Sequence, residues 1–289
     1  MPTPVRIPLA WLKSDEAVSF LLGRAPKPKE DVVSYTTAWD EARAALNARP
    51  AYTETQFTKP LPPMLKEVAE QFRRRPEAMQ TFQGQDWELR MIDLGNLLGS
   101  QKQIHTDSID SRVEAYSEND PAALFSLLLP EEKADDVLVT VDQASKSFTI
   151  TAMNPNLSVM AMTSAEVPSS QAPGGISKMT KIYGYAVAVK PSYATAVEYR
   201  GRMFLRDGYH RCYGLLKKGV RWVPAVVVRA QSYQQLGANT AAFLPEEILF
   251  SERPLFLRDY FDDSVTATVW QKTPRKIVRI RAEEYVIPA

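Results

Sequence analysis

The sequence predicts an α+β fold, in which a helical N-terminal part precedes a mixed β-sheet. Apolar residues recur at helical spacing in roughly the first 130 residues, whereas from residue 137 onward apolar and polar residues tend to alternate. The 21 prolines act as punctuation between short elements, and no repeat of solenoid length is found. We therefore expect a mainly helical region over residues 1–130 and a β-rich domain with C-terminal strands over residues 131–289.

Three segments of the first region have the pattern of helices. The clearest are residues 38–48 and 62–75, and the second opens with two prolines, which a first helical turn accepts because its N–H groups have no intrahelical partner. Residues 118–133 form the third pattern, with Asn119 or Asp120 placed to cap the helix ahead of a proline. Amphipathic helices of this kind could also offer a surface to a protein partner.

The first strand pattern is a hairpin. Residues 137–141 and 148–152 both contain β-branched residues and flank a polar turn. Further along the chain, residues 183–190 alternate so that Tyr183 and Tyr185 share one side with two valines. This alternation predicts a strand with one buried face.

The remaining strand patterns surround one helix. Two short runs meet at the Arg200–Gly201 turn, and the second run continues into FLRDGYHRCYGLLKKG, residues 204–219. That stretch ends a strand, turns at a glycine and then places apolar residues at i, i+3, i+4 and i+7, which predicts a helix. Residues 222–230 predict another strand, and the C-terminal segment predicts two strands broken near Pro274.

Charge and apolar content narrow the classes of function. Lys and Arg total 35 against 34 Asp and Glu, so the net charge of +1 provides no global field that would attract nucleic acid or a membrane. The N-terminal apolar stretch is short and interrupted, unlike a signal peptide, and no apolar run approaches the ~20 residues of a membrane span. We expect a cytoplasmic protein without a membrane partner, in which any basic site is local. The sequence does not indicate an oligomeric state.

The few sulfur and imidazole groups exclude further chemistry. Cys212 is the only cysteine, so no disulfide can form within the chain. His105 and His210 are the only histidines, so a zinc site of the usual Cys/His kind cannot be assembled either. The sequence also lacks the GxxxxGK phosphate loop, the HExxH zinc motif and the GxSxG nucleophile elbow.

The turn at residues 207–211 concentrates the polar chemistry. Gly208 permits a sharp backbone course, after which the first amides of the predicted helix lack intrahelical partners and carry the positive end of its dipole. In a structural hypothesis, Asp207 caps this helix and pairs with Arg211, while His210 lies on the surface. In a functional hypothesis, the amides, Arg211 and His210 together hold a phosphate. Local chemistry leaves both open.

The stretch FLRDGYHRCYGLLKKG, followed by VRWVPAVVV, resembles the ParB/sulfiredoxin-like superfamily, including its ParB-like nuclease-type domains. The resemblance covers about residues 183–230 and depends on a DGxHR element between a strand and a helix. It implies a ParB/sulfiredoxin-like unit whose turn binds phosphates of a nucleotide or a nucleic acid. It also implies that Gly208, His210 and Arg211 contact phosphate. His210 and Asp207 are then the candidate catalytic residues, with Asp207 orienting the basic groups or helping to hold a metal.

A second polar loop is a candidate for the same site. Gln101, Gln103 and His105 follow an apolar run, and members of the superfamily that this chain resembles carry a glutamine-bearing loop beside the phosphate site. His105 with Asp107 could form a catalytic or supporting pair. The alternative is that His105 is an exposed loop residue.

These observations predict a protein that binds a nucleotide or a nucleic acid through a phosphate at the 207–211 turn. Phosphate transfer or hydrolysis could follow, with His210 as acid or base and Arg211 stabilising developing charge, so a phosphotransferase, a phosphohydrolase and a nuclease are all open. Mg²⁺ accompanying a nucleotide is the expected cofactor, since Asp207 supplies an oxygen ligand. The alternative is a non-catalytic interaction module, in which the turn is structural and the N-terminal helices bind a protein partner.

Overall fold

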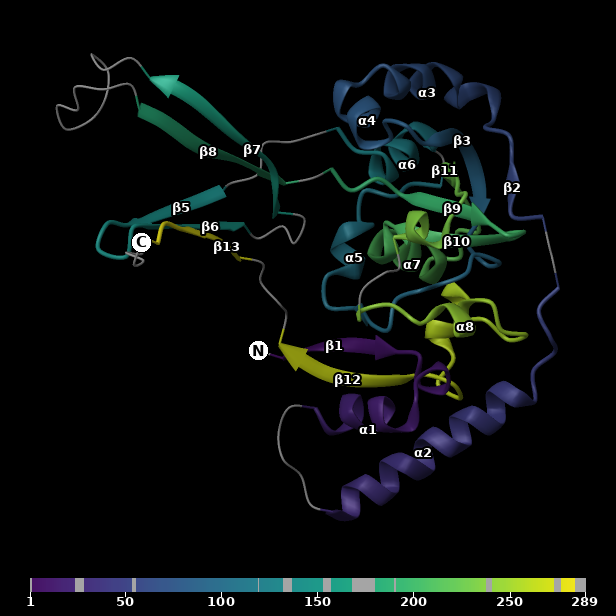
Figure 1. The fold of residues 1–289 in the computed structure, drawn as a ribbon. Helices are drawn as coiled ribbons and strands as arrows, with labels where there is room; N and C mark the ends of the chain where they lie inside the picture. The colour runs from purple at the N-terminus through teal and green to yellow at the C-terminus, as the bar shows by residue number, and fades with distance from the viewer. Residues whose placement is uncertain are drawn as a thin grey trace. The chain divides into compact units, whose positions relative to one another are not determined.

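The computed structural model divides the chain into two compact units (Figure 1). The larger unit joins Met1–Glu131 to Ser192–Thr273, and the smaller unit joins Glu132–Pro191 to Pro274–Ala289. The α+β class is confirmed. The structure describes residues 2–23, 29–53, 56–118, 120–131, 137–152, 157–167, 180–189, 191–237, 241–272 and 277–283.

The helical elements of the larger unit are, in chain order, η1 (Leu9–Trp11), α1 (Ser14–Leu22), α2 (Lys29–Asn47), η2 (Pro63–Leu65), α3 (Lys66–Arg73), α4 (Pro76–Thr81), α5 (Ile109–Arg112), α6 (Pro121–Leu128), α7 (Tyr209–Lys217), η5 (Tyr233–Leu236), α8 (Glu246–Leu249) and η6 (Leu257–Phe261). The three predicted N-terminal helices are confirmed as α2, α3 and α6. Asp120 caps α6, because its carboxylate accepts a hydrogen bond of 2.8 Å from the Ala123 N–H. Asn119, the other predicted cap, lies outside the described residues.

The central sheet of the larger unit is mixed, with the strand order β10-β9-β11-β3-β2. Its strands are β2 (Thr58–Lys59), β3 (Asp86–Asp93), β9 (Thr195–Tyr199), β10 (Arg202–Asp207) and β11 (Trp222–Arg229). β9 and β11 run parallel, and the other neighbours run antiparallel. β11 is buried along most of its length because it lies between β9 and β3, which explains its run of three valines. The mixed sheet and the predicted Arg200–Gly201 turn between β9 and β10 are thus confirmed.

The region predicted to be mainly helical also contributes strands. β3 pairs with β11 along eight residue pairs, from Trp222↔Asp93 to Arg229↔Asp86, and so joins the two segments of the larger unit. A second sheet has the order β12-β1-β4, formed by β1 (Pro2–Ile7), β4 (Ile104–His105) and β12 (Ala267–Lys272). The strands paired in this way are far apart in the sequence. Local periodicity can predict each strand but not its partner.

The smaller unit consists of two sheets in its described part. β5 (Val137–Asp142), β6 (Ser147–Ala152) and β13 (Ile277–Arg281) form one, and β7 (Leu157–Val167) and β8 (Thr180–Val189) form the other. The predicted β5–β6 hairpin is confirmed, as are two C-terminal strands, β12 and β13; Pro274 between them lies outside the described residues. The predicted buried face of β8 is wrong at Tyr183 and Tyr185, which are 67% and 46% exposed. Among the described strands β8 pairs with β7 alone, and this two-stranded sheet leaves both tyrosines in solvent.

Candidate functional site

The geometry at the start of α7 depends on one glycine. β10 ends at Asp207, and Gly208 follows in a left-handed conformation, with a φ of 87°, before α7 begins at Tyr209. A β-carbon on Gly208 would lie 2.9 Å from the α-carbon of Ala194. Both the backbone conformation and this close approach require glycine. The predicted order of strand, turn and helix is confirmed.

Asp207 and Tyr209 hold the turn on either side of Gly208. The Asp207 Oδ1 atom accepts a hydrogen bond of 2.6 Å from the Gly208 N–H and one of 3.1 Å from the Ser192 hydroxyl. The buried Tyr209 hydroxyl accepts a hydrogen bond of 2.7 Å from the Ser100 N–H. Burial raises the pKa of Tyr209 to about 12, so this hydroxyl stays neutral and serves as a hydrogen-bonding anchor.

The Arg211 guanidinium binds main-chain oxygens. Its Nη1 donates to the carbonyls of Leu127 and Leu128 at 2.9 and 3.3 Å. Its Nη2 donates to the carbonyl and the hydroxyl of Ser192 at 2.6 and 2.9 Å. Arg211 therefore supplies donors to carbonyls that have no intrahelical partner at the C-terminal end of α6. The structural hypothesis is met only in part. The Ser192 hydroxyl links Arg211 to Asp207, but no side chain of the described residues caps α7 at Gly208, and His210 is half-buried instead of lying on the surface.

His210, in the first turn of α7, lies near the loop that carries His105. Burial, followed by nearby charge on Arg112 and His105, lowers the pKa of His210 to about 4, while Asp107 acts in the opposite direction. Burial also lowers the pKa of His105, again against the effect of Asp107. Both rings are therefore neutral at pH 7. The two ring nitrogens of His105 are buried and have no hydrogen-bond partner among the described residues.

Close packing of α5 on α7 brings this cluster together. Gly214 lies in α7, and a β-carbon there would be 2.8 Å from the side chain of Ile109 and 2.9 Å from that of Val113. A larger residue would separate the two helices and move Arg112 away from His210. The sequence analysis did not predict a role for Arg112. Its position near His210 depends on the packing of α5 against Gly214, which is remote in the chain.

The two glutamines of the second loop are half-buried. Gln101 forms an isolated β-bridge with Phe243, and its carbonyl accepts a hydrogen bond from the Tyr260 hydroxyl. Gln103 directly precedes β4. Of the three residues predicted in this loop, His105 is the one that interacts electrostatically with His210.

The described residues contain no group of three His, Cys, Asp or Glu side chains that could hold a metal ion. One Asp207 oxygen already accepts two hydrogen bonds within the turn. A Mg²⁺ ion held by the protein alone at Asp207 therefore does not fit the described part of the chain. Cys212 is a free, buried thiol whose pKa burial raises to about 12, so it is also a poor metal ligand.

Comparisons with known proteins identify no match for this chain: no protein-family model, no curated protein and no solved structure. The resemblance of residues 204–219 to the ParB/sulfiredoxin-like superfamily therefore stays a prediction from the sequence. Over the residues that the structure describes, no helix combines the length and the apolar character needed to cross a membrane.

Proposed function

We propose that the protein binds a phosphate group of a nucleotide or a nucleic acid beside the first turn of α7. The observation that carries this proposal is that β4, which ends at His105, packs against α7, which carries His210, and that the charge of Arg112 acts on His210. These are the chain's only two histidines. A buried polar atom without a partner is costly and rare in folded proteins. A phosphate ester with a nearby hydroxyl offers both acceptor and donor oxygens, which suit the two ring nitrogens of a neutral His105.

The electrostatics at the start of α7 favour the same ligand. The first-turn amides of this nine-residue helix carry the positive end of its dipole. Arg112 adds an exposed guanidinium, whose Nε donates to the Ser108 hydroxyl at 3.2 Å. In this proposal Arg211 and Asp207 are positioning residues, because their hydrogen bonds hold the turn. Ligand contact is assigned to His210, His105 and Arg112.

This arrangement could also support phosphate transfer or hydrolysis. The lowered pKa of His210 keeps its ring unprotonated at pH 7, as a general base requires. Arg112 would stabilise negative charge that develops on the phosphate. Mg²⁺ enters this proposal only as the ion that accompanies a nucleotide. A single free cysteine is consistent with a reducing, cytoplasmic setting.

Isothermal titration calorimetry tests the proposal, with ATP, ADP and a 5′-phosphorylated single-stranded oligonucleotide as probes, each with and without Mg²⁺. We expect at least one probe to bind, and Arg112→Gln to weaken binding about tenfold, because a hydrogen bond between charged groups contributes roughly 1.5 kcal/mol or more. His210→Asn should weaken binding similarly and abolish any release of phosphate. The matched control is Arg74→Gln, an exposed arginine after α3, which should bind as the wild type does. Absence of binding by every probe, or equal affinity in all four proteins, would overturn the proposal.

A non-catalytic interaction module is the second candidate, and the hydrogen bonds of Arg211 to the end of α6 favour it, because they give this side chain a structural role. In that case none of the three probes binds, and a protein partner is retained equally by the wild type and His210→Asn. Charge reversal at an exposed position of α2, Glu41→Arg, should then release the partner. Retention of the partner by Glu41→Arg would argue against binding through α2.

A further inference from the structure

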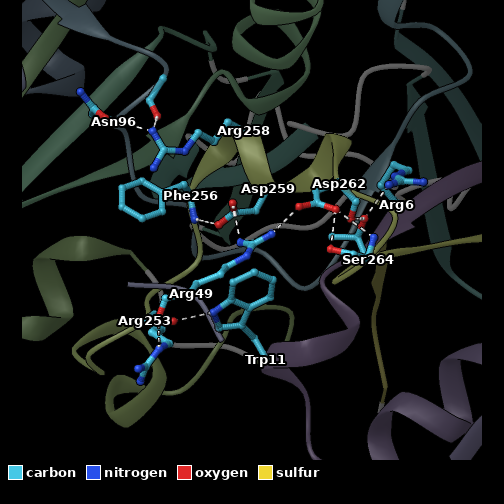
Figure 2. A network of polar contacts seen from close by, with 12 residues as sticks. Arg6, Trp11, Arg49, Asn96, Arg253, Phe256, Arg258, Asp259, Asp262 and Ser264 are labelled. Atoms are coloured by element: carbon cyan, nitrogen blue, oxygen red, sulfur yellow. Dashed lines mark hydrogen bonds and ion pairs between the residues drawn. The ribbon is translucent and has the colours of Figure 1, made fainter. Parts of the chain in front are cut away.

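A cavity of about 470 Å³ lies in the larger unit, between the end of α2 and the segment that contains η6. Figure 2 shows a network of polar contacts that includes several of its lining residues, among them Arg49, Arg253 and Arg258. Cavities of this size hold small organic ligands in many proteins. The lining includes three arginines, two acids and two aromatic rings, and none of these residues belongs to the site proposed above.

Arg49 lies between the two acids of the cavity and pairs with both. Its Nη1 and Nη2 donate to Asp259 and Asp262 at 2.9 and 2.5 Å, as the dashed lines of Figure 2 show. Asp259 is only 5% exposed and also accepts a hydrogen bond of 2.8 Å from the Phe256 N–H. Burial raises the pKa of Asp259, whereas this hydrogen bond and the nearby charges of Arg49 and Arg258 lower it. With three arginines and two acids, the lining carries a net charge of +1, so one of its cationic charges is not balanced by an acid of the lining.

Arg258 is held beside the cavity with donors to spare. Its Nη1 donates to the Gly95 carbonyl at 2.9 Å and to Asn96 Oδ1 at 3.2 Å. Its guanidinium lies 4.3 Å from the centre of the Phe256 ring, a cation–π contact that fixes the plane of the group. The described contacts use neither Nε nor Nη2, and they include no ion pair of Arg258 with an acid. Two N–H groups on one edge of the guanidinium therefore face no described protein acceptor.

Arg253 is anchored in a similar way. Its Nε donates to the Arg49 carbonyl at 2.8 Å, and its own carbonyl accepts a hydrogen bond of 2.8 Å from Trp11 Nε1. Its Nη1 has a long contact of 3.4 Å with Glu252, a side chain that is largely exposed. Such an exposed pair contributes little, so a buried anion would compete with it successfully.

The walls beside these arginines are apolar. Tyr52 and Phe256 line the cavity with their ring centroids 6.1 Å apart. The Tyr52 N–H donates to the Glu252 carbonyl at 2.6 Å, which holds the loop after α2 against the 252–256 segment. Leu46 and Pro254 add further apolar side chains to the lining.

We propose that this cavity binds a small organic anion. Its carboxylate or phosphate head contacts Arg253 and Arg258, and its aromatic or aliphatic body lies against Tyr52 and Phe256. Arginine suits such a head because the guanidinium donates parallel hydrogen bonds to two oxygens of one oxyanion. The apolar wall excludes a bare inorganic ion as the preferred ligand, since the ion would leave that surface uncovered.

Titration calorimetry of the full chain with phenyl phosphate, benzoate and inorganic phosphate tests this proposal. The first two probes distinguish a phosphate head from a carboxylate head, and the third lacks the body. At least one aromatic anion should bind at millimolar concentration or below, and more tightly than inorganic phosphate. Arg253→Gln and Arg258→Gln should each weaken it on the order of tenfold. Arg258→Lys keeps the charge but loses the paired donors, so it should have an intermediate affinity.

Two control variants separate this site from the rest of the molecule. Arg74→Gln and His210→Asn should both bind the aromatic anion as the wild type does, so loss of the function proposed at α7 leaves this result unchanged. Failure of both aromatic anions to bind would overturn the proposal, as would wild-type affinity in both Arg→Gln variants. Inorganic phosphate binding as tightly as phenyl phosphate would overturn the assignment of the apolar wall.

Discussion

Arg211→Ala removes hydrogen bonds to three main-chain carbonyls and one hydroxyl between the end of α6 and the start of β9; the Leu128 carbonyl keeps its other donor, the Ala194 amide. A hydrogen bond to a charged group contributes about 1.5–3 kcal/mol, and a buried carbonyl left unpaired costs a similar amount. Three of the four distances lie between 2.6 and 2.9 Å, while the contact with Leu128 at 3.3 Å is weaker. Water entering the vacated space restores part of the loss. We therefore expect the free energy of unfolding to fall by about 3 kcal/mol.

Urea unfolding followed by tryptophan fluorescence measures this loss. Hydrogen exchange of the Ala194 amide locates it, because that amide donates to the Leu128 carbonyl beside Arg211. Arg211→Lys keeps the charge without the forked donors and should have an intermediate stability. The exposed Arg112→Ala serves as the control and should stay within about 0.5 kcal/mol of the wild type. An Arg211→Ala protein as stable as this control would refute the structural role of the guanidinium.

Two other predictions concern the same turn. Gly208→Ala should lower the free energy of unfolding by about 2–5 kcal/mol, because alanine is strained at a φ of 87° and its β-carbon meets Ala194. The control is Gly219→Ala, at a φ of 82° with open space around it, which should lower the free energy of unfolding by only about 1–2 kcal/mol. Equal losses in urea unfolding would contradict the contact with Ala194. The pKa of His210 lies at about 4 in the folded chain and near 6.5 when unfolded, so the unfolded state binds more protons between these values and stability falls as pH drops from 6.5 to 4. For this partly buried ring we expect the free energy of unfolding to fall by about 1–3 kcal/mol over this pH range. Urea unfolding at several pH values should show a smaller fall in His210→Asn, because asparagine does not titrate.

The local elements around the turn were predictable because their determinants lie within a few residues. Asp120 followed by proline defines the start of α6, and the β5–β6 hairpin and the strand, turn and helix at 204–219 follow from periodicity and one glycine. The same reasoning assigned a buried face to β8, where Tyr183 and Tyr185 are exposed. Alternation indicates that a strand can bury one side, but whether another layer covers that side is a tertiary property.

From the sequence alone came the α+β class, the main helices, and the concentration of polar chemistry at 207–211. The tertiary structure decided what that chemistry contacts. Arg211 reaches a carbonyl 84 residues earlier in the chain, and the approach of Arg112 to His210 depends on α5 packing against Gly214. The cavity around Arg253 and Arg258 likewise combines segments with no local relation to one another. Capping and periodicity act over one or two turns, whereas the partner of a charged side chain is set by how distant elements pack.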